Sequence, residues 1–369
     1  MAALGLFEPG KVYRAMKILI IGGTGNISTP LTKMLLEQGH DLTLFKREAK
    51  VPEWLGAAHI IPGDRCRRDE FRRKLSGPET FDCVIDMICY EPEDALCDIE
   101  LFRGRTGQFI FCSTVDVYTK TPASYPVTEQ NGVIGALPSF PYAYKKVLCE
   151  RAMWEAHRRG DFALTLIRPA FTYNETWSPG IHSFGGQRYH LDRIRRGKPI
   201  ILHGDGTSVW VATYRDDVAR AFVGAVGNRK TFGEDYNLSG DEWMTHNHIW
   251  RTIARVMGAP EPDFVYIPTD VLARIAPQYA EWCRENFRHN NIFDTSKAKR
   301  DLGYRYTVRF EEGVRKCVDY LSRNNLIEDC DAYPFYDRIV EAWRNHTGRL
   351  IEEIMKDEAP KPGRGAHEK

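Results

Sequence analysis

The chain has 369 residues, of which 43% are hydrophobic, 27% charged and 12% aromatic, a composition typical of a folded globular protein with room for two α/β parts. Its 51 basic residues nearly balance its 50 acidic ones, so the net charge of +1 gives no support for binding to nucleic acids or membrane surfaces. No apolar run approaches the length needed to cross a bilayer, and the N-terminus lacks a signal-peptide pattern, so we expect a soluble, cytoplasmic protein.

Nine cysteines are scattered along the chain without the spacing of a disulfide framework or a metal site. There is no CxxC pair, and Cys83, Cys89 and Cys112 lie inside apolar runs. We therefore predict reduced cysteines, mostly in the core of an intracellular protein, and no bound metal.

Strand-like and helix-like segments alternate over the first half of the chain. Apolar, β-branched runs that are separated by stretches with helical spacing predict parallel βαβ units. The expected strands are 17–21, 41–45, 59–61, 82–87 and 108–112, and the clearest helices are 29–38, 70–75 and 93–102. The predicted fold class is therefore α/β, with a Rossmann-type doubly wound parallel sheet covered by helices on both faces.

Five arginines cluster just after the third expected strand. They are Arg65, Arg67, Arg68, Arg72 and Arg73. Such a cluster is more often a solvated face than a track for phosphates, and we interpret it as a solvated face.

The sequence changes character after Arg168-Pro169. Residues 173–187 are rich in glycine, proline, aromatic and polar residues, and they suit a substrate-binding surface or a plain connection equally well. Short strands are expected over 200–203 and 236–238, among helices. We predict a smaller C-terminal substrate lobe that closes over the carboxyl edge of the sheet, where open α/β sheets place ligands.

A glycine-rich loop joins the first expected strand to the first helix. It reads Gly22-Gly23-Thr24-Gly25-Asn26-Ile27-Ser28. Its glycines allow a sharp turn and a close approach of a pyrophosphate, and the helix that follows presents free N–H groups to that anion. Ser28 stands where a third glycine is usual, and its small side chain should still allow close packing. The loop therefore predicts a dinucleotide cofactor.

Four parts of the chain follow from these patterns. Residues 1–16 form an N-terminal extension, 17–173 an NAD(P)-binding Rossmann domain, and 174–356 the substrate lobe, with segments that return to the Rossmann domain. Residues 357–369 are rich in lysine, proline and glycine and are expected to form a disordered tail.

The end of the second strand bears on which dinucleotide is bound. NAD-binding folds commonly place an acidic residue there for the ribose hydroxyl, whereas this chain has Lys46 and Arg47. Two cations suit a 2′-phosphate, so the pair slightly favours NADP over NAD. The alternative is that both point into solvent and that Glu48 or a backbone group serves the ribose. Asp64, after the third strand, is placed to bind the adenine amino group.

Tyr142 and Lys146 form a Tyr-x-x-x-Lys pair that shares one face of a helix. A lysine ammonium beside a phenol favours phenolate, so Lys146 is expected to lower the pKa of Tyr142 and to hold the nicotinamide ribose. Tyr142 would then exchange a proton with a substrate hydroxyl or carbonyl while a hydride moves. Thr114, or else Ser113, supplies a hydroxyl for the substrate oxygen at the end of the fifth strand; the alternative is that both merely cap that strand.

In this order the motifs resemble the extended short-chain dehydrogenase/reductases, the NAD-dependent epimerase/dehydratase family typified by UDP-galactose 4-epimerase. The matching segments, between Lys17 and about Leu321, are the glycine loop, Ser113-Thr114, Val117-Tyr118, Tyr142/Lys146 with Glu150, Leu166–Pro169, Gly204–Gly206, Asp217–Ala219, Asp294–Ala298 and Leu302–Tyr304. The resemblance implies a Thr114, Tyr142 and Lys146 triad, a place for Arg168 at the cofactor, and a homodimer packed partly through the Tyr142 helix.

The sequence departs from the family at the expected diphosphate-binding arginine. That place holds Trp210, and Arg215 lies further along as a possible substitute. The departure favours a smaller polyol, free sugar or sugar conjugate over a sugar nucleotide. Trp177 and Trp210 are candidates to stack on a sugar face, with Tyr189 and Trp243, although aromatic residues in such a lobe are more often core.

Three functions remain open from the sequence. The first is an epimerase that recycles its cofactor at a secondary alcohol of a sugar-like substrate, and the second is an NADPH-dependent reductase of a small carbonyl or sugar. Dehydration is disfavoured, because Val115-Asp116 follows the threonine where dehydratases carry Asp-Glu. The third, of another class, is a non-catalytic NADP-sensing or RNA-binding relative, which the Tyr142/Lys146 pair argues against.

Overall fold

The computed structural model describes residues 14–47 and 52–357. Most of the predicted N-terminal extension, Glu48 and nearly all of the predicted tail lie outside these residues. The chain divides into two compact units. Of the described residues, unit 1 comprises 14–47, 52–175, 209–244 and 289–317, and unit 2 comprises 176–208, 245–288 and 318–357. Trp210 and Arg215, which the sequence placed in the substrate lobe, therefore belong to the unit that carries the glycine loop.

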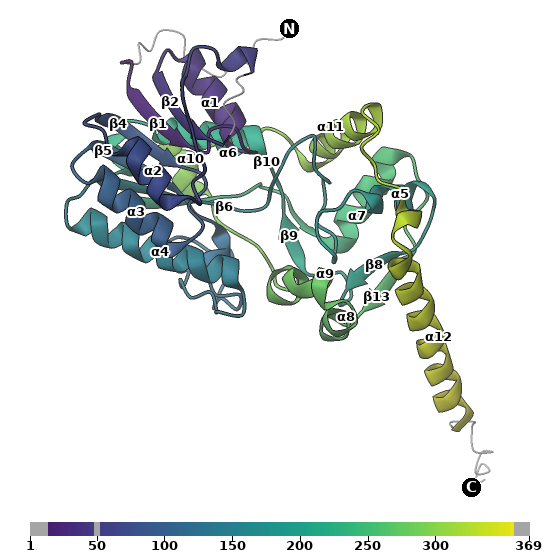
Figure 1. The fold of residues 1–369 in the computed structure, drawn as a ribbon. Helices are drawn as coiled ribbons and strands as arrows, with labels where there is room; N and C mark the ends of the chain where they lie inside the picture. The colour runs from purple at the N-terminus through teal and green to yellow at the C-terminus, as the bar shows by residue number, and fades with distance from the viewer. Residues whose placement is uncertain (1–13, 48–51, 358–369) are drawn as a thin grey trace, which may run out of the picture. The chain divides into compact units, whose positions relative to one another are not determined.

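Unit 1 is built on a seven-stranded sheet in the order β11-β6-β5-β4-β1-β2-β3 (Figure 1). Its strands are β1 (Lys17–Ile21), β2 (Asp41–Lys46), β3 (His59–Pro62), β4 (Phe81–Asp86), β5 (Thr106–Cys112), β6 (Ala163–Pro169) and β11 (Glu234–Leu238). All neighbouring pairs are parallel. The predicted Rossmann-type α/β sheet is confirmed, and the five predicted early strands are found within two residues of their expected bounds.

Helices cover both faces of the sheet, as a parallel sheet requires. They are α1 (Ser28–Glu37), α6 (Arg215–Ala225) and α10 (Ser296–Leu302) on one face, and α2 (Arg68–Leu75), α3 (Pro92–Phe102) and α4 (Pro141–Arg158) on the other. Each face has its own cluster of buried apolar side chains, such as Leu31 and Phe222 on the first face and Phe71 and Met153 on the second. These two layers fix the strand ends at which loops can hold a ligand.

The order of the sheet reverses between β1 and β4. β2 and β3 lie to one side of β1, whereas β4, β5, β6 and β11 lie to the other. Ligands of open α/β sheets bind beyond the carboxyl ends of the strands at such a point. The loops that leave there are the glycine loop after β1, residues 87–91 after β4 and residues 113–118 after β5.

Unit 1 also holds short elements outside the main sheet. They are η1 (Glu53–Leu55), η2 (Val115–Val117), the parallel pair β7 (Thr172–Tyr173) and β10 (Thr213–Tyr214), the pair β9 (Val209–Val211) and β12 (Trp243–Thr245), η3 (Arg229–Thr231) and the start of α11 (Phe310–Arg323). Gly313 packs so closely on the Tyr173 ring that a Cβ would meet its hydroxyl. This contact ties α11 to the strand that follows β6.

Unit 2 is smaller and mostly helical. Its elements are α5 (Tyr189–Arg195), β8 (Ile200–His203), α7 (His246–Met257), β13 (Phe264–Ile267), α8 (Thr269–Ile275), α9 (Pro277–Trp282), η4 (Cys283–Phe287), η5 (Cys330–Ala332) and α12 (Pro334–Asp357). β8 and β13 pair in parallel. Aromatic side chains fill its core, as where Tyr189 stacks on Tyr333 at 3.9 Å between ring centroids. Among the described residues, no helix is long and apolar enough to cross a membrane.

The arginine cluster after β3 is only partly the solvated face expected from the sequence. Arg65 is 3% exposed and donates two hydrogen bonds to the Asp98 carboxylate, at 2.8 and 2.7 Å. Its guanidinium also lies 3.0 Å from Asp86 and stacks over the Phe71 ring. For Arg65 the prediction is wrong, because two buried carboxylates from β4 and α3 draw this side chain inward, where a buried charge needs a partner.

Four histidines of unit 2, namely His182, His190, His203 and His246, lie in its interior, each no more than 2% exposed. The rings of His182 and His190 stack at 3.6 Å, and those of His203 and His246 meet edge to face at 4.5 Å. Burial lowers the pKa of all four, that of His203 to about 4. In the folded unit the four rings are therefore neutral at neutral pH.

This histidine cluster predicts acid lability of unit 2. Because the pKa values are lowered in the folded state, the unfolded chain binds more protons once the pH falls below about 6.5, the ordinary histidine pKa. The free energy of unfolding is therefore unaffected by the histidines above that pH. It falls as the pH drops toward 4, by roughly 1.4 kcal/mol per pH unit for each histidine. Urea unfolding followed by tryptophan fluorescence at several pH values measures the slope.

A single substitution tests the origin of this slope. Both ring nitrogens of His190 are buried without a hydrogen-bond partner, so His190→Phe should preserve the packing and flatten the pH dependence by about one histidine's share. Phe184→Leu, which alters a buried ring beside His182 without changing a titratable group, is the matched control and should leave the slope unchanged. An unfolding free energy that is the same at pH about 5 and about 7 would contradict the account.

Candidate functional site

The glycine loop after β1 is folded tightly by its own polar groups. Ser28 donates to the Gly22 carbonyl at 2.5 Å and accepts from the Gly25 amide at 2.7 Å, and Thr32 donates to the Gly23 carbonyl at 2.8 Å. The serine that replaces the third glycine thus stabilises the loop through two hydrogen bonds. Thr24 and Gly25 are exposed at the tip, while Ile27 packs against the core below α1.

Gly22 and Gly23 leave no room for a side chain. Gly22 has a φ of +87°, and a Cβ there would lie 2.7 Å from Ile88; a Cβ on Gly23 would lie 2.5 Å from Leu44. The loop can therefore keep this path, close to β1 and at the N-terminus of α1, only with glycine. These are the features that a pyrophosphate cradle needs, so the residues present fit a dinucleotide.

Substitution of Gly22 by alanine should disable this cradle. The new methyl group meets Ile88 and the positive φ strains the backbone, so we expect nucleotide affinity to fall more than tenfold, about 1.4 kcal/mol or more. Gly39→Ala is the matched control, since Gly39 has a φ of +79° but no atom within 4 Å of the added Cβ. Fluorescence titration with NADH and NADPH measures both. Equal affinities for Gly22→Ala and the wild type would contradict the assignment.

Asn26 ties the glycine loop to the segment that follows β6. Its side-chain amide donates to the Thr172 carbonyl at 2.8 Å and accepts from the Asn174 amide at 2.8 Å. The side chain of Asn26 is thus used in holding the loop, while its backbone stays at the helix N-terminus. It acts as a support of the cofactor loop.

At the end of β2, Lys46 and Arg47 lie in different surroundings. Lys46 is 8% exposed, with its carbonyl accepting from the Gly63 amide at 2.8 Å, whereas Arg47 is exposed. Asp64 is partly buried beyond β3 and accepts from the Cys66 amide at 3.0 Å. These residues lie at the carboxyl ends of β2 and β3, on the side where the sequence predicted the adenosine half of the cofactor.

Thr114, Tyr142 and Lys146 come together at the carboxyl end of β5. Thr114 follows the strand directly, and Tyr142 and Lys146 lie one turn apart in the first half of α4. A hydrogen bond links the Thr114 hydroxyl to the Tyr142 phenol. Lys146 is 1% exposed and donates to the Cys112 carbonyl at 2.7 Å. Residues distant in sequence thus form one cluster of a hydroxyl, a phenol and an ammonium.

The charge around Tyr142 differs from the sequence-based expectation. Burial raises the pKa of Tyr142, the Asp116 carboxylate raises it further, and the hydrogen bond from Thr114 lowers it. Lys146 instead lowers the pKa of Tyr90, against the effect of burial, and its Nζ lies 4.9 Å from the centroid of the Tyr90 ring. The expected lowering of the Tyr142 pKa by Lys146 is therefore wrong for this geometry, in which Tyr142 is a phenol that can donate its proton.

Asp116 is the acidic neighbour of the cluster. It is 9% exposed and receives an ion pair from Lys120 at 2.7 Å, and its other oxygen lies 3.4 Å from the Thr114 hydroxyl. Its backbone amide donates to that hydroxyl at 3.2 Å. The sequence weighed Asp116 only as an imperfect match to dehydratases; the η2 turn brings its carboxylate near Thr114 and Tyr142.

Ser113 and Arg168 belong to a buried network behind the cluster. Ser113 donates to Glu150 at 2.5 Å, and Arg168, 2% exposed, donates two hydrogen bonds to the same carboxylate. Arg168 also pairs with Asp235 at 2.5 Å and donates to the Tyr118 hydroxyl at 2.8 Å. Both nitrogen-bearing arms of Arg168 are thus engaged by protein groups. These partners make Arg168 a buried link between β6, α4 and β11.

The residues predicted to bind substrate are dispersed. Trp210 is 5% exposed within β9 and is therefore a buried side chain. Arg215 begins α6 and pairs with Glu175 at 2.6 Å. Trp177, in unit 2, is 47% exposed. Of the three candidate tryptophans, Trp177 and Trp243, which is 50% exposed, offer a face for stacking, and Trp210 does not.

Two residues of the site were missed by the sequence reasoning. Tyr90 stands at the carboxyl end of β4, with its ring centroid 6.5 Å from that of Tyr142. Asp86, the last residue of β4, is wholly buried and accepts from the Ile88 amide at 2.7 Å, which shapes the loop that carries Tyr90. The sequence could have indicated both residues, because residues at the carboxyl end of a central parallel strand lie at the edge of the sheet where ligands bind.

A parallel sheet with a glycine loop at its switch point and a Thr-Tyr-Lys cluster beside it is the arrangement expected of a dinucleotide-binding site. Residues 94–239 match the NAD dependent epimerase/dehydratase family. These residues therefore match the domain of that family, and the fold of the chain is similar to that of an epimerase solved with NAD.

Similar proteins within this group differ in function. The chain is 27% identical over 314 residues to the chloroplast stem-loop binding protein of 41 kDa b of Arabidopsis thaliana, covering 81% of this chain and 77% of that one. It is 24% identical to the 2-alkyl-3-oxoalkanoate reductase of Stenotrophomonas maltophilia, covering 82% and 98%. A UDP-glucuronic acid 4-epimerase from Bacillus cereus, solved in complex with NAD, has the same fold, with a TM-score of 0.62, 20% identity and coverage of 84% and 99%.

Proposed function

We propose that this protein is an NAD(P)-dependent enzyme that transfers a hydride at a secondary alcohol or ketone of a sugar or sugar nucleotide, with Tyr142 as acid/base. The observation that carries the proposal is the hydrogen-bonded Thr114–Tyr142 pair with Lys146 one turn along α4, at the strand ends beside the glycine loop. A binding protein would need the loop but not this cluster.

Each group has a distinct task in this reaction. The loop from Gly22 to Ile27 and the N-terminus of α1 hold the pyrophosphate, and Lys146 holds the nicotinamide ribose. The nicotinamide, when bound, accepts or supplies the hydride. Thr114 donates a hydrogen bond to the substrate oxygen, and Tyr142 gives a proton to that oxygen or takes one from it. The raised pKa of Tyr142 favours the direction in which it begins as the proton donor, that is, carbonyl reduction.

Within this class we place epimerisation slightly ahead of net reduction. The order of the family motifs favours epimerisation, and the similarity to sugar-nucleotide epimerases in fold agrees with it. The alternative is an NADPH-dependent reductase of a small carbonyl or sugar substrate. The similarity to the oxoalkanoate reductase and the raised pKa of Tyr142 favour this alternative. Because Arg215 is paired with Glu175, a diphosphate would have to displace that carboxylate.

The reaction class can be tested by incubating the protein with each nicotinamide cofactor and a panel of sugar nucleotides, free sugars and 3-oxoacyl compounds. Conversion of a sugar at constant nicotinamide absorbance indicates an epimerase, and stoichiometric loss of NADPH absorbance indicates a reductase. Tyr142→Phe run in parallel separates enzymatic from background conversion. Failure of every compound to be converted, with cofactor bound, would overturn the catalytic proposal.

The cofactor preference rests on Lys46 and Arg47. We expect NADP to be favoured slightly, since two cations suit its 2′-phosphate. Arg47→Ala should then weaken NADPH binding by about fivefold to tenfold and leave NADH binding unchanged, as loss of one charged hydrogen bond predicts. Arg67→Ala, an exposed arginine of the cluster after β3, is the control. An equal effect on both cofactors would remove the basis for the preference.

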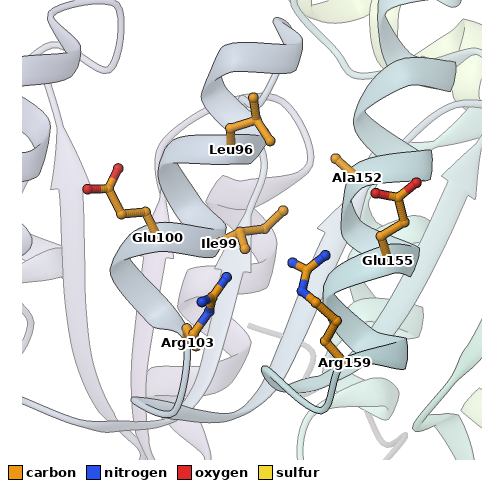
Figure 2. A pocket seen from close by; sticks show the side chains of 7 residues that line it. All are labelled: Leu96, Ile99, Glu100, Arg103, Ala152, Glu155 and Arg159. Carbon is orange, nitrogen blue, oxygen red and sulfur yellow. The ribbon is translucent and has the colours of Figure 1, made fainter.

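We also propose a homodimer that packs through α3 and α4. A groove of about 290 Å³ runs between these helices, with Leu96 at 58% exposure and Ile99 pointing toward α4 (Figure 2). An acidic side chain from each helix, and the arginine that follows each helix, line it, which suits a two-fold contact between identical surfaces.

Leu96→Glu should convert the dimer to monomers, as measured by light scattering. Leu350→Glu on α12 is the control and should leave the dimer intact. A wild-type protein that is already monomeric would contradict this proposal.

The cysteines support a cytoplasmic location. All nine are free thiols, eight of them buried and Cys66 exposed. An exposed thiol without a partner suits a reducing compartment. A small sugar-like molecule is the partner that this enzyme requires.

The second candidate function is a non-catalytic RNA-binding or NADP-sensing role. The similarity to the chloroplast stem-loop binding protein favours it. Filter binding to a stem-loop RNA, with the double-stranded stem and a single-stranded RNA as controls, tests it. Tight and salt-dependent stem-loop binding that survives Tyr142→Phe, together with no turnover of any compound, would favour this role over catalysis.

A further inference from the structure

Tyr90 is a residue of the site to which neither the motifs nor the comparisons assign a role. It lies four residues beyond the end of β4 and is 48% exposed. The centroid of its ring is 4.9 Å from Lys146 Nζ and 6.5 Å from the centroid of the Tyr142 ring. A half-exposed aromatic side chain therefore lies against both members of the proposed catalytic pair.

The chain on both sides of Tyr90 is held in place. Asp86 accepts from the Ile88 amide at 2.7 Å, and Glu91 caps α3 through a reciprocal pair of hydrogen bonds with Asp94. The Glu91 carboxylate also pairs with Lys145 of α4 at 2.8 Å. Because Lys145 is the neighbour of Lys146, this ion pair joins the Tyr90 segment to the helix that carries the catalytic groups.

Lys146 is enclosed by three groups. Its ammonium donates to the Cys112 carbonyl at 2.7 Å and lies between two aromatic rings, 5.0 Å from the Phe111 centroid and 4.9 Å from that of Tyr90. Phe111 is wholly buried in β5, so it forms the inner side of this enclosure. Tyr90 forms the side that faces the ligand edge of the sheet, and a cation held against a ring away from water is bound more strongly than one at an open surface.

The charge of Lys146 acts on Tyr90 in return. Burial raises the pKa of Tyr90, and the ammonium of Lys146 lowers it. The pKa of Tyr142 instead depends on burial, Asp116 and Thr114. The phenols of Tyr90 and Tyr142 are thus in different electrostatic surroundings.

We infer that Tyr90 is a positioning residue of the catalytic centre, whose ring covers the Lys146 ammonium, keeps water from it and fixes it where it must meet the cofactor ribose and Tyr142. The inference rests on the proposed function, because it gives Tyr90 a task toward the proposed pair. The ring performs this task, and the hydroxyl does not. Phenylalanine can therefore replace Tyr90, whereas alanine or leucine cannot.

Fluorescence titration of the full-length protein with NADH and NADPH tests the inference. Tyr90→Ala and Tyr90→Leu should weaken binding by about fivefold to thirtyfold, the range of one desolvated cation–π contact, and Tyr90→Phe should stay within about twofold of the wild type. Tyr320→Ala, at a tyrosine of α11 that is 38% exposed, is the control and should bind normally. Tyr90→Leu keeps a larger apolar side chain than alanine but has no aromatic ring, so it separates loss of the ring from loss of packing should Tyr90→Ala unfold.

Two further results decide the inference. In a Lys146→Met background, Tyr90→Ala should change nucleotide affinity much less than it does in the wild type, because the Tyr90 ring acts on Lys146. Strictly additive effects of the two substitutions would overturn the inference. Equal losses of affinity in Tyr90→Phe and Tyr90→Ala would also overturn it. Ultraviolet titration of the Tyr90 phenol, taken as the difference between wild type and Tyr90→Phe, needs no cofactor. Lys146→Met should raise the pH at which Tyr90 ionises, and no change would overturn the contact. A wild type that binds neither nucleotide yet shows this shift would refute the proposed function alone.

Discussion

Tyr142→Phe is expected to lower turnover by about a hundredfold to ten-thousandfold, the usual share of a general acid or base. The substitution removes only the phenol oxygen, which is hydrogen-bonded to Thr114 and is the group that exchanges a proton with the substrate. The glycine loop and Lys146 are untouched, so binding of NADH or NADPH should stay within about twofold. The loss should therefore appear in kcat at saturating cofactor. Steady-state kinetics on the converted substrate measure it.

Tyr144→Phe is the matched control for this prediction. Tyr144 lies two residues further along α4 and is likewise partly buried, but it stands on a different side of the helix. Its variant should retain the activity of the wild type. Full turnover in Tyr142→Phe would contradict the assignment of Tyr142 as the acid/base.

Arg168→Ala is expected to reduce the free energy of unfolding of unit 1 by about 3–5 kcal/mol, the usual cost of removing one partner of a buried ion pair. Glu150, 2% exposed, would keep its charge without the guanidinium that now donates two hydrogen bonds to it. Tyr118 and Asp235 would lose a partner as well. Urea unfolding monitored by circular dichroism measures the loss.

Two variants show whether the loss comes from the buried charge. Arg151→Ala, on the exposed side of α4, should change the unfolding free energy by no more than about 0.5 kcal/mol. Glu150→Leu combined with Arg168→Met removes both charges and should recover much of the stability that Arg168→Ala loses. A double variant as unstable as Arg168→Ala alone would mean that packing, not charge pairing, sets the cost.

The fold could be predicted from the sequence because its signals are local. The alternation of apolar runs and helical spacing marks each βαβ unit, and Gly22-Gly23 marks the turn between β1 and α1. The cluster of Thr114, Tyr142 and Lys146 was also predictable, since the carboxyl end of β5 and the start of α4 follow each other along the chain. A third glycine is not required in the loop, because Ser28 fits there and makes two hydrogen bonds. Those hydrogen bonds could not be predicted from the local sequence pattern.

The parts that could not be predicted depend on contacts between distant segments. Arg65 is buried because Asp86 and Asp98 come from two other elements, and a run of arginines by itself suggests only a solvated surface. Arg168 matches a family motif, but its partners Glu150 and Asp235 show what the side chain does. The pKa of Tyr142 was misjudged for the same reason, since a helical spacing of four does not say whether an ammonium faces the phenol or a neighbouring ring.

The central claim, that this fold holds a nicotinamide cofactor for hydride transfer, is tested most directly by identifying the nucleotide in the purified protein. The protein is denatured, the released nucleotide is separated and identified, and the remaining protein is titrated with NADH and NADPH. The account predicts one nicotinamide dinucleotide per chain, either retained through purification, as in an epimerase, or bound on titration, as in a reductase. A folded protein that releases no nucleotide and binds neither NADH nor NADPH would contradict it.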